Sequence, residues 1–156
     1  MKEKIVYNPV GVIHTPFSDP AGMPIQSPGG KDICGTVEVF PGFAEGLKDI
    51  EGFSRIILIY HFHRAGDCRL SVIPFLDTVP HGVFSTSAPS RPNPIGLSVV
   101  HLTARKDSCL QVSGVDMLDG TPLLDIKPYL PECDAYLSER TGWFPQGDSR
   151  FAEARS

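Results

Sequence analysis

Several features that would assign a class at once are missing from this 156-residue sequence. Its most apolar strand-like stretch, Ile56–Tyr60, is far too short to cross a bilayer, and the N-terminal residues do not form a secretory signal. The formal net charge is only −4, so the chain has no overall attraction to nucleic acid, although basic groups outnumber acidic ones over residues 55–127. We therefore expect a cytoplasmic protein that does not bind membranes. A local basic patch formed by the middle of the chain is an alternative that these numbers do not exclude.

Motifs for metal, redox and nucleotide chemistry are also missing. The four cysteines, Cys34, Cys68, Cys109 and Cys133, are too far apart in sequence for a CxxC zinc or redox pair. No GxGxxG, Walker, GxSxG or HExxH string occurs, so the common nucleotide folds and hydrolase sites have no support. Reduced thiols and no resident metal are the expectation.

Glycine and proline are abundant, at 15 residues each, which favours short strands joined by turns over long helices. Phe43, Leu47 and Ile50 have the spacing of a short amphipathic helix that ends at Gly52. Apolar patterning predicts strands over 7–14, 34–40, 55–63, 69–76, 97–104, 110–117 and 122–127. We therefore predict an all-β fold: a small closed barrel of short antiparallel strands with one or two short helices, because closure removes exposed edges. The barrel domain would cover residues 1–145, with a long surface loop at 16–32 and a disordered tail at 146–156.

A proline-rich segment, residues 91–96, is the first candidate for a binding site; we call it the ribbon. Pro92 and Pro94 fix the backbone and push Arg91 and Asn93 into extended geometry, which displays both side chains at little entropic cost on binding. Gly96 would let another group approach the backbone. A rigid connection between strands explains the segment equally well.

The second candidate is the turn at Asp119 and Gly120, which we call the corner, and the strand that follows it. Strand alternation places Leu124 and Ile126 toward the core, so Asp125, Lys127 and Tyr129 share the opposite face, within reach of one ligand. A solvated Asp–Lys pair is the simpler interpretation of the same residues.

His61 and His63 are two apart on a predicted strand and would share a face, as metal ligands do. No third ligand is suggested nearby, so a metal-dependent hydrolase is a weak alternative. A hydrogen-bonded, partly buried pair is the simpler explanation.

These segments together resemble the TsaA-like (YaeB/TrmO) family of S-adenosylmethionine-dependent methyltransferases. The resemblance covers roughly residues 8–145. Its most specific parts are the string Arg-Pro-Asn-Pro-Ile-Gly-Leu-Ser at 91–98 and the later Leu-Asp-Gly-Thr-Pro and Asp-Ile-Lys-Pro-Tyr at 118–122 and 125–129. The family implies a barrel that forms a homodimer, with S-adenosylmethionine bound near the subunit interface. Bacterial members methylate N6 of threonylcarbamoyladenosine at position 37 of tRNA.

The resemblance also implies roles for individual residues. Asp125, Lys127 and Tyr129 would face the substrate, with Asp125 taking or orienting the N6 proton. The donor would be held by Arg91, Pro92, Asn93, Pro94, Gly96, Asp119, Gly120, Thr121 and Leu123.

Two features differ from the tRNA-type members. Ser87 stands where they carry an arginine, and the chain stops at Ser156 without the extra C-terminal domain of the long bacterial forms. With the acidic net charge, these differences leave other acceptors open: a small molecule, a protein side chain, or no acceptor at all in a module that only binds S-adenosylmethionine or RNA.

Overall fold

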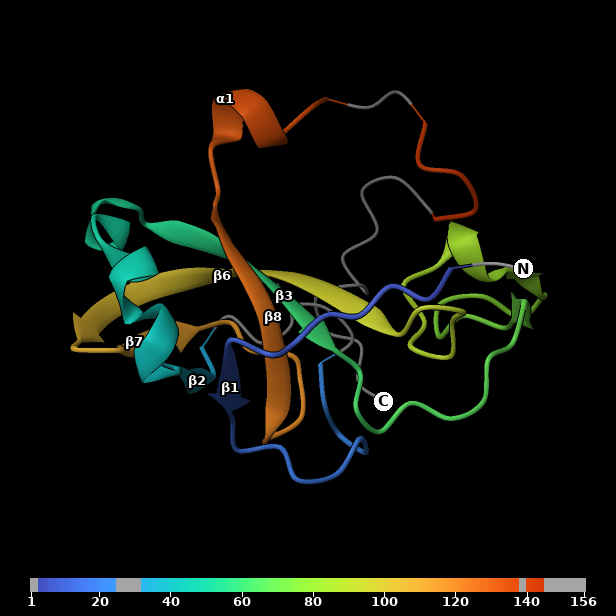
Figure 1. Cartoon of the computed structure of the whole chain (residues 1–156). Helices are drawn as coiled ribbons and strands as arrows, with labels where there is room; N and C mark the ends of the chain where they lie inside the picture. Colours follow the sequence, from blue (N-terminus) through green and yellow to red (C-terminus); the bar gives the residue numbers. More distant parts are fainter. Residues whose placement is uncertain (1–2, 25–31, 138–139, 145–156) are drawn as a thin grey trace.

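A computed structural model describes residues 3–24, 32–137 and 140–144 of the chain. Six strands close into a barrel in the order β1–β2–β7–β6–β3–β8, and β8 pairs back onto β1 (Figure 1). Every pairing is antiparallel. The barrel strands are β1 (Gly11–His14), β2 (Cys34–Val39), β3 (Arg55–His61), β6 (Ile95–Lys106), β7 (Cys109–Ser113) and β8 (Thr121–Pro128). The predicted all-β barrel is thus confirmed.

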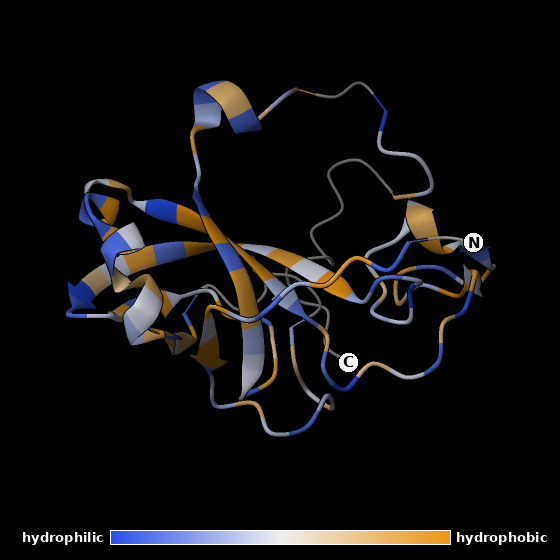
Figure 2. Cartoon of the chain, viewed as in Figure 1, coloured by the Kyte–Doolittle hydropathy of each residue, from blue (hydrophilic) through white to orange (hydrophobic). Residues whose placement is uncertain are grey.

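The core fills the barrel interior with side chains from alternate strand positions. On β3, Ile56 and Leu58 are fully buried, while Ile57 between them faces outward and is partly buried. The same alternation of burial runs along β6. Figure 2 shows apolar and polar residues interspersed along the barrel strands. Alternation of this kind fixes the register, because a slip of one residue would turn the whole apolar set toward water.

An irregularity in β8 breaks this alternation. Ile59 of β3 pairs with Asp125, but the next residue, Tyr60, pairs with Leu123, so Leu124 is left over as a bulge. The inward positions are therefore Leu123, which is fully buried, and Ile126, which packs against the core. The prediction that Leu124 faces the core was wrong, because strict alternation cannot anticipate an extra residue.

The helical elements are short. The segment predicted as one amphipathic helix forms two 3₁₀ helices, η2 (Pro41–Leu47) and η3 (Ile50–Gly52). Asp49 separates them with a φ of 71°, a left-handed conformation that a continuous helix does not contain. The other helices of the described residues are η4 (Val83–Ser85) and α1 (Pro131–Asp134).

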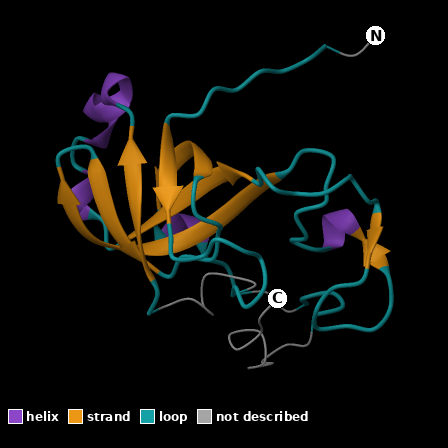
Figure 3. Ribbon diagram, turned by 90° about the horizontal axis from the view of Figure 1, so that it is seen from below, coloured by secondary structure: helices purple, strands orange, loops and turns teal. Residues whose placement is uncertain are grey.

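A small second sheet lies beside the barrel, as Figure 3 shows. It pairs β4 (Ser71–Val72) with β5 (His81–Gly82), two residues from each. The predicted strand at 69–76 is therefore wrong as a barrel strand. Pro74 lacks the N–H that a longer ladder would need and stops the strand soon after Val72.

Other strand ends shifted by a few residues. The first strand begins at Gly11 rather than residue 7, and the third ends at His61 rather than residue 63. The strand predicted at 110–117 is β7, which ends at Ser113 because Gly114 has a φ of 92° and turns the chain away from the ladder. Within the described residues, no helix has the length and apolar character needed to span a bilayer. The proposed disordered tail at 146–156 and residues 25–31 of the predicted loop lie outside the described residues.

Candidate functional site

The two candidate motifs lie at one end of the barrel. β1, β3 and β7 finish at this end, whereas β2, β6 and β8 begin there, because all pairings are antiparallel. We call it the loop end; its connections comprise residues 15–19, 62–64, 91–94 and 114–120. Hydrogen bonds join these connections; for example, the amide of Phe62 donates to Pro94 O at 2.8 Å, and Arg64 Nη1 donates to Ser18 O at 2.7 Å.

The ribbon is bounded by tight turns, but its arginine is not displayed as predicted. Tight turns enclose the two prolines: the amide of Arg91 donates to Pro89 O, and that of Ile95 donates to Asn93 O. The guanidinium of Arg91 folds back and donates from Nη1 to the carbonyls of Thr86 (3.0 Å) and Ala88 (2.9 Å). In the single chain Arg91 therefore braces its own loop, and Asn93 is the exposed side chain of the two.

Gly96 is required by an aromatic neighbour. A Cβ at this position would lie 2.6 Å from Cζ of Tyr60 and 2.9 Å from Cζ of Phe62, too close for either ring. The two rings meet edge to face with centroids 5.5 Å apart. The group that approaches this backbone is thus the ring of Tyr60, not an external ligand.

The corner has the conformation that its sequence predicts. Gly120 has a φ of 81°, and its amide donates to Ile13 O at 2.9 Å. Asp119 is held on two sides: its amide donates to Phe17 O, and its Oδ1 accepts from the amide of Thr15 at 3.0 Å. The Asp119 carboxylate is still half-exposed, at 50%.

Thr121 and Leu123, the next two residues proposed to hold the ligand, have side chains that point inward. Thr121 is buried and donates from Oγ1 to Leu118 O at 2.6 Å, while Leu123 belongs to the core. Their side chains lie in the barrel interior beneath the corner. Any contact they make with a ligand at the surface would therefore be through the backbone.

Ribbon and corner are separated by a single strand. In the barrel register, Gly96 is opposite Tyr60, and Tyr60 is opposite Leu123 on its other side. Since neighbouring strands lie about 4.8 Å apart, the backbones at Gly96 and Leu123 are about 10 Å apart. The structure thus brings together the two segments that the sequence analysis linked.

The three proposed acceptor residues extend away from the loop end along β8. Lys127 Nζ lies 3.1 Å from Asp125 Oδ2, and both side chains are exposed. Tyr129 follows the strand, and its amide donates to Arg55 O at the start of β3, at the opposite end of the barrel. At about 3.3 Å per residue, Asp125 is about 13 Å along β8 from Thr121. In the register, Asp125 lies across β3 from Leu97, one residue past the ribbon, whereas Lys127 and Tyr129 lie progressively farther from it.

Two clusters at the loop end were missed by sequence reasoning. His14 lies between two carboxylates, with Nε2 3.0 Å from Glu38 Oε1 and Nδ1 3.6 Å from Asp119 Oδ1. Only the β1–β2 register brings His14 to Glu38, so no local pattern could have paired them.

The second missed cluster is internal. The hydroxyl of Ser98 bonds to Asp116 Oδ1 at 2.6 Å and to the phenol of Tyr60 at 2.8 Å. Burial, and then the negative charge of Asp116, raises the pKa of the Tyr60 phenol, while the hydrogen bond with Ser98 partly opposes this. The serine closing the 91–98 string was the available signal.

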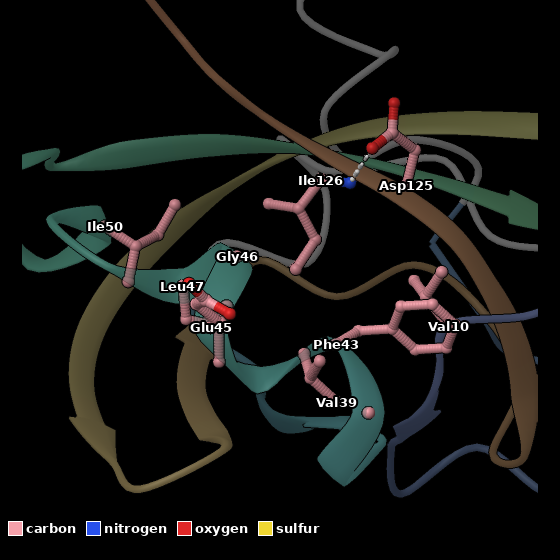
Figure 4. A pocket seen from close by; sticks show the side chains of 10 residues that line it. Val10, Val39, Phe43, Glu45, Gly46, Leu47, Ile50, Asp125 and Ile126 are labelled. Carbon is pink, nitrogen blue, oxygen red and sulfur yellow. Dashed lines mark hydrogen bonds between the residues drawn. The ribbon is translucent and has the colours of Figure 1, made fainter.

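Two hollows of the described part lie away from the ribbon–corner gap. One, of about 520 Å³, is lined by apolar residues including Val10, Phe43 and Ile126, with Asp125 at its edge (Figure 4). The Asp125 carboxylate is turned away from these apolar side chains and accepts from the amide of Ile126 at 2.9 Å. The other hollow, of about 550 Å³, lies between the small sheet and residues 88–90.

The metal alternative gains nothing from the geometry. Among the residues that the structure describes, no three or more His, Cys, Asp or Glu side chains are grouped to hold a metal ion. Partial burial, followed by the nearby Arg64 and His61, lowers the pKa of His63. His61 and His63 therefore have no third ligand among these residues.

Comparison with known proteins assigns the chain to a family. The family described as "tRNA-methyltransferase O N-terminal domain" matches residues 12–135. A probable S-adenosyl-L-methionine-binding protein of Pyrococcus abyssi is 58% identical over 151 residues, which cover 97% of this chain and 82% of that protein. The human tRNA (adenine(37)-N6)-methyltransferase is 35% identical over 142 residues, but these cover only 31% of its length and 84% of this chain.

A solved structure agrees in fold. The crystal structure of TrmO from Pseudomonas aeruginosa superposes with a TM-score of 0.77 at 36% sequence identity. The match covers 92% of this chain and 64% of that chain, so the present chain corresponds to somewhat less than two thirds of the P. aeruginosa protein.

Proposed function

Because the chain belongs to the family of tRNA-methyltransferase O N-terminal domains, we propose that it is an S-adenosylmethionine-dependent methyltransferase whose acceptor is N6 of threonylcarbamoyladenosine at position 37 of tRNA. The observation that carries this proposal is the placement of ribbon and corner on either side of the end of β3. S-Adenosylmethionine supplies an electrophilic methyl group on a sulfonium centre.

The residues at the loop end fit this donor. Its positive charge is matched by the half-exposed carboxylate of Asp119, which two backbone contacts hold in place. Asn93 presents an exposed amide that both donates and accepts hydrogen bonds. A Cβ on Gly120 would meet nothing within 4 Å, so the surface beside the corner is open. A carboxylate, an amide and an open backbone suit a charged, polar ligand.

On the acceptor side, Asp125 takes or orients the N6 proton, Lys127 holds a substrate carboxylate or phosphate, and Tyr129 positions the edge of the acceptor. The contact between Lys127 Nζ and Asp125 Oδ2, together with the Ile126 amide on Oδ1, holds the carboxylate in one orientation. The main task of such a site is alignment, since a methyl transfer needs nucleophile and carbon about 3 Å apart.

A homodimer would complete the site. On the outer face of the barrel, Asp125, Ile59 and Leu97 lie side by side in register on β8, β3 and β6. Leu97 is 59% exposed, and Ile95, next to the ribbon, is 42% exposed. A second copy that packed on this apolar face would add its own ribbon beside Asp125 and enclose the site from outside.

The test of the function uses the full chain with S-adenosylmethionine carrying a labelled methyl group. We expect label in bulk tRNA and release of S-adenosylhomocysteine. Asp125→Asn and Lys127→Ala should each lower turnover about a hundredfold, whereas the exposed controls Asp49→Asn and Lys106→Ala should not.

Each other outcome identifies an alternative. Label that enters only a small-molecule or protein fraction rejects tRNA and keeps the methyltransferase. Donor binding without S-adenosylhomocysteine identifies a non-catalytic module. Unchanged turnover in both Asp125→Asn and Lys127→Ala removes their proposed roles.

The dimer has its own test, light scattering after size-exclusion chromatography. Wild type should elute with twice the chain mass, and Leu97→Lys should be monomeric. Leu137→Lys, at a fully exposed position, is the control that should leave the dimer intact. A monomeric wild type rejects this part of the proposal. The cytoplasm is the proposed location, supported by four cysteines that are all free thiols, as in a reducing compartment.

A further inference from the structure

Ser98 ends the most specific string in the sequence, yet it faces the barrel interior. It is 2% exposed, and its hydroxyl bonds to two buried partners, Tyr60 (3% exposed) and Asp116 (8% exposed). A buried polar chain of this kind costs free energy when it is broken, because each freed group is left without water.

The hydrogen bonds among Tyr60, Ser98 and Asp116 connect the ribbon and the corner through the barrel interior. Ser98 is two residues beyond Gly96, whose backbone is covered by the ring of Tyr60. Asp116 lies in the connection between β7 and β8, three residues before Asp119 of the corner. The hydrogen bonds Tyr60–Ser98–Asp116 therefore run from the strand that carries the ribbon to the connection that carries the corner.

The connection around Asp116 transmits position to the corner. Its neighbours Val115 and Met117 are also buried, so this part of the chain is set into the barrel interior rather than lying on its surface. Thr15 links this connection to the corner, since its Oγ1 donates to Met117 O at 2.8 Å and its amide donates to Asp119 Oδ1. A shift of Asp116 would thus move Asp119.

We propose that Asp116, acting through Ser98, is a positioning residue that fixes the spacing between ribbon and corner and thereby sets the affinity for the methyl donor. The proposal rests on the proposed function for the identity of the ligand. Asp116 does not touch the donor; it holds in place the segments that do.

The experiment compares Asp116→Asn, Ser98→Ala and their double variant with wild type in the full chain. Each single variant should raise the KM for S-adenosylmethionine, and its dissociation constant by calorimetry, about tenfold, the size expected for one hydrogen bond to a charged group. kcat should change less than about threefold, because no group that contacts the reacting atoms is altered. The double variant should also lose about tenfold rather than a hundredfold, because both substitutions break the same link.

A second measurement does not depend on the ligand. Hydrogen exchange of the ligand-free protein should speed up in peptides covering 91–96 and 117–121 in both single variants, with β2 unchanged. Thr103→Val is the control: it removes another hydroxyl on β6, seven residues along the strand from Gly96, whose Oγ1 donates to Gln111 O. It should alter neither donor affinity nor exchange at the ribbon and corner. If Asp116→Asn or Ser98→Ala fails to fold, Tyr60→Phe is used instead. It removes only the hydroxyl that bonds to Ser98 and should also raise exchange at the ribbon and corner and weaken donor binding.

The outcomes separate the two proposals. If wild type binds no S-adenosylmethionine but exchange rises at both segments in the variants, the function fails and the positioning role stands. If wild type binds the donor and the variants change neither exchange nor affinity, or lower kcat while KM stays constant, the positioning role is overturned. An equal loss of affinity in Thr103→Val would show general destabilisation and overturn it too.

Discussion

Replacing Gly96 with alanine should destabilise the barrel by forcing aromatic side chains apart. The new Cβ would lie 2.6 Å from Cζ of Tyr60 and 2.9 Å from Cζ of Phe62. Carbon atoms in contact normally stay about 3.5–4.0 Å apart, so the Tyr60 ring would have to move by about 1 Å. It is 3% exposed and bonded to Ser98, so this movement strains the core and breaks a buried hydrogen bond.

The expected cost combines two effects. Overpacking of a filled core costs about 1–3 kcal/mol, and a buried hydrogen bond that is lost costs about 1 kcal/mol more. We expect the free energy of unfolding to fall by about 2–4 kcal/mol and the melting temperature by about 5–15 °C. Urea denaturation followed by circular dichroism measures the first, and a thermal melt measures the second.

Gly46→Ala is the matched control. A Cβ there would meet nothing within 4 Å, so the substitution should leave stability within about 0.5 kcal/mol or raise it slightly. If Gly96→Ala is as stable as Gly46→Ala, the ring of Tyr60 does not enforce glycine at this position and the reasoning is refuted.

Three further substitutions test other parts of the fold. The pKa of Tyr60 in the folded protein lies above its ordinary value of 10.0, so the contribution of Tyr60 to stability is present below pH 10.0 and is lost as pH rises through the raised value. In urea titrations at alkaline pH, the free energy of unfolding of Tyr60→Phe should therefore fall less steeply with pH than that of wild type. A hydrogen bond from Arg105 is the main cause that lowers the pKa of Glu51 below 4.5, so its contribution is present above pH 4.5 and is lost as pH falls through the lowered value. Arg105→Ala should return the Glu51 pKa toward 4.5 in an NMR titration, and an unmoved pKa would contradict this cause. Leu58→Ala, at a fully buried position, should cost about 2–5 kcal/mol in urea denaturation, and a loss below 1 kcal/mol would mean that the core refills the space.

Strand content and barrel closure could be predicted from the sequence because they depend on local patterns. Alternation over 34–40 and the apolar run at 55–63 predicted strands that end within two residues of the observed β2 and β3. The turn at Gly120 was recognisable because Asp-Gly favours a positive φ, which the structure shows. The resemblance added the family, which the match over residues 12–135 confirms.

What sequence reasoning missed depends on long-range packing. The bulge at Leu124 follows from how β8 fits both β1 and β3, and nothing in the local alternation marks it. The fold-back of Arg91 depends on where two carbonyls of the preceding turn point, which composition does not encode. The strand predicted at 69–76 had suitable residues but only a two-residue partner, so tertiary context decided against it.

In the candidate site, too, local patterns predicted some features and missed those that depend on how the strands are arranged. Nearness of ribbon and corner was predicted and is observed, because both precede strands that pair with β3. The roles of Asp125, Lys127 and Tyr129 stay predictions. Alternation correctly put Asp125 and Lys127 on one exposed face, but it could not show that the loop end lies beyond the other end of the same strand.

The joint between β1 and β8 has a consequence for how the protein is made. It joins the first and last barrel strands through three register pairs, Gly11 with Leu123, Val12 with Pro122 and Ile13 with Thr121, and Pro122 has no amide hydrogen to contribute. A nascent chain cannot form this seam until residue 123 has left the ribosome, and until then both flanking strands expose open edges. Closure should therefore be a late event in folding, and the seam should be the first place where the finished barrel opens under heat or force.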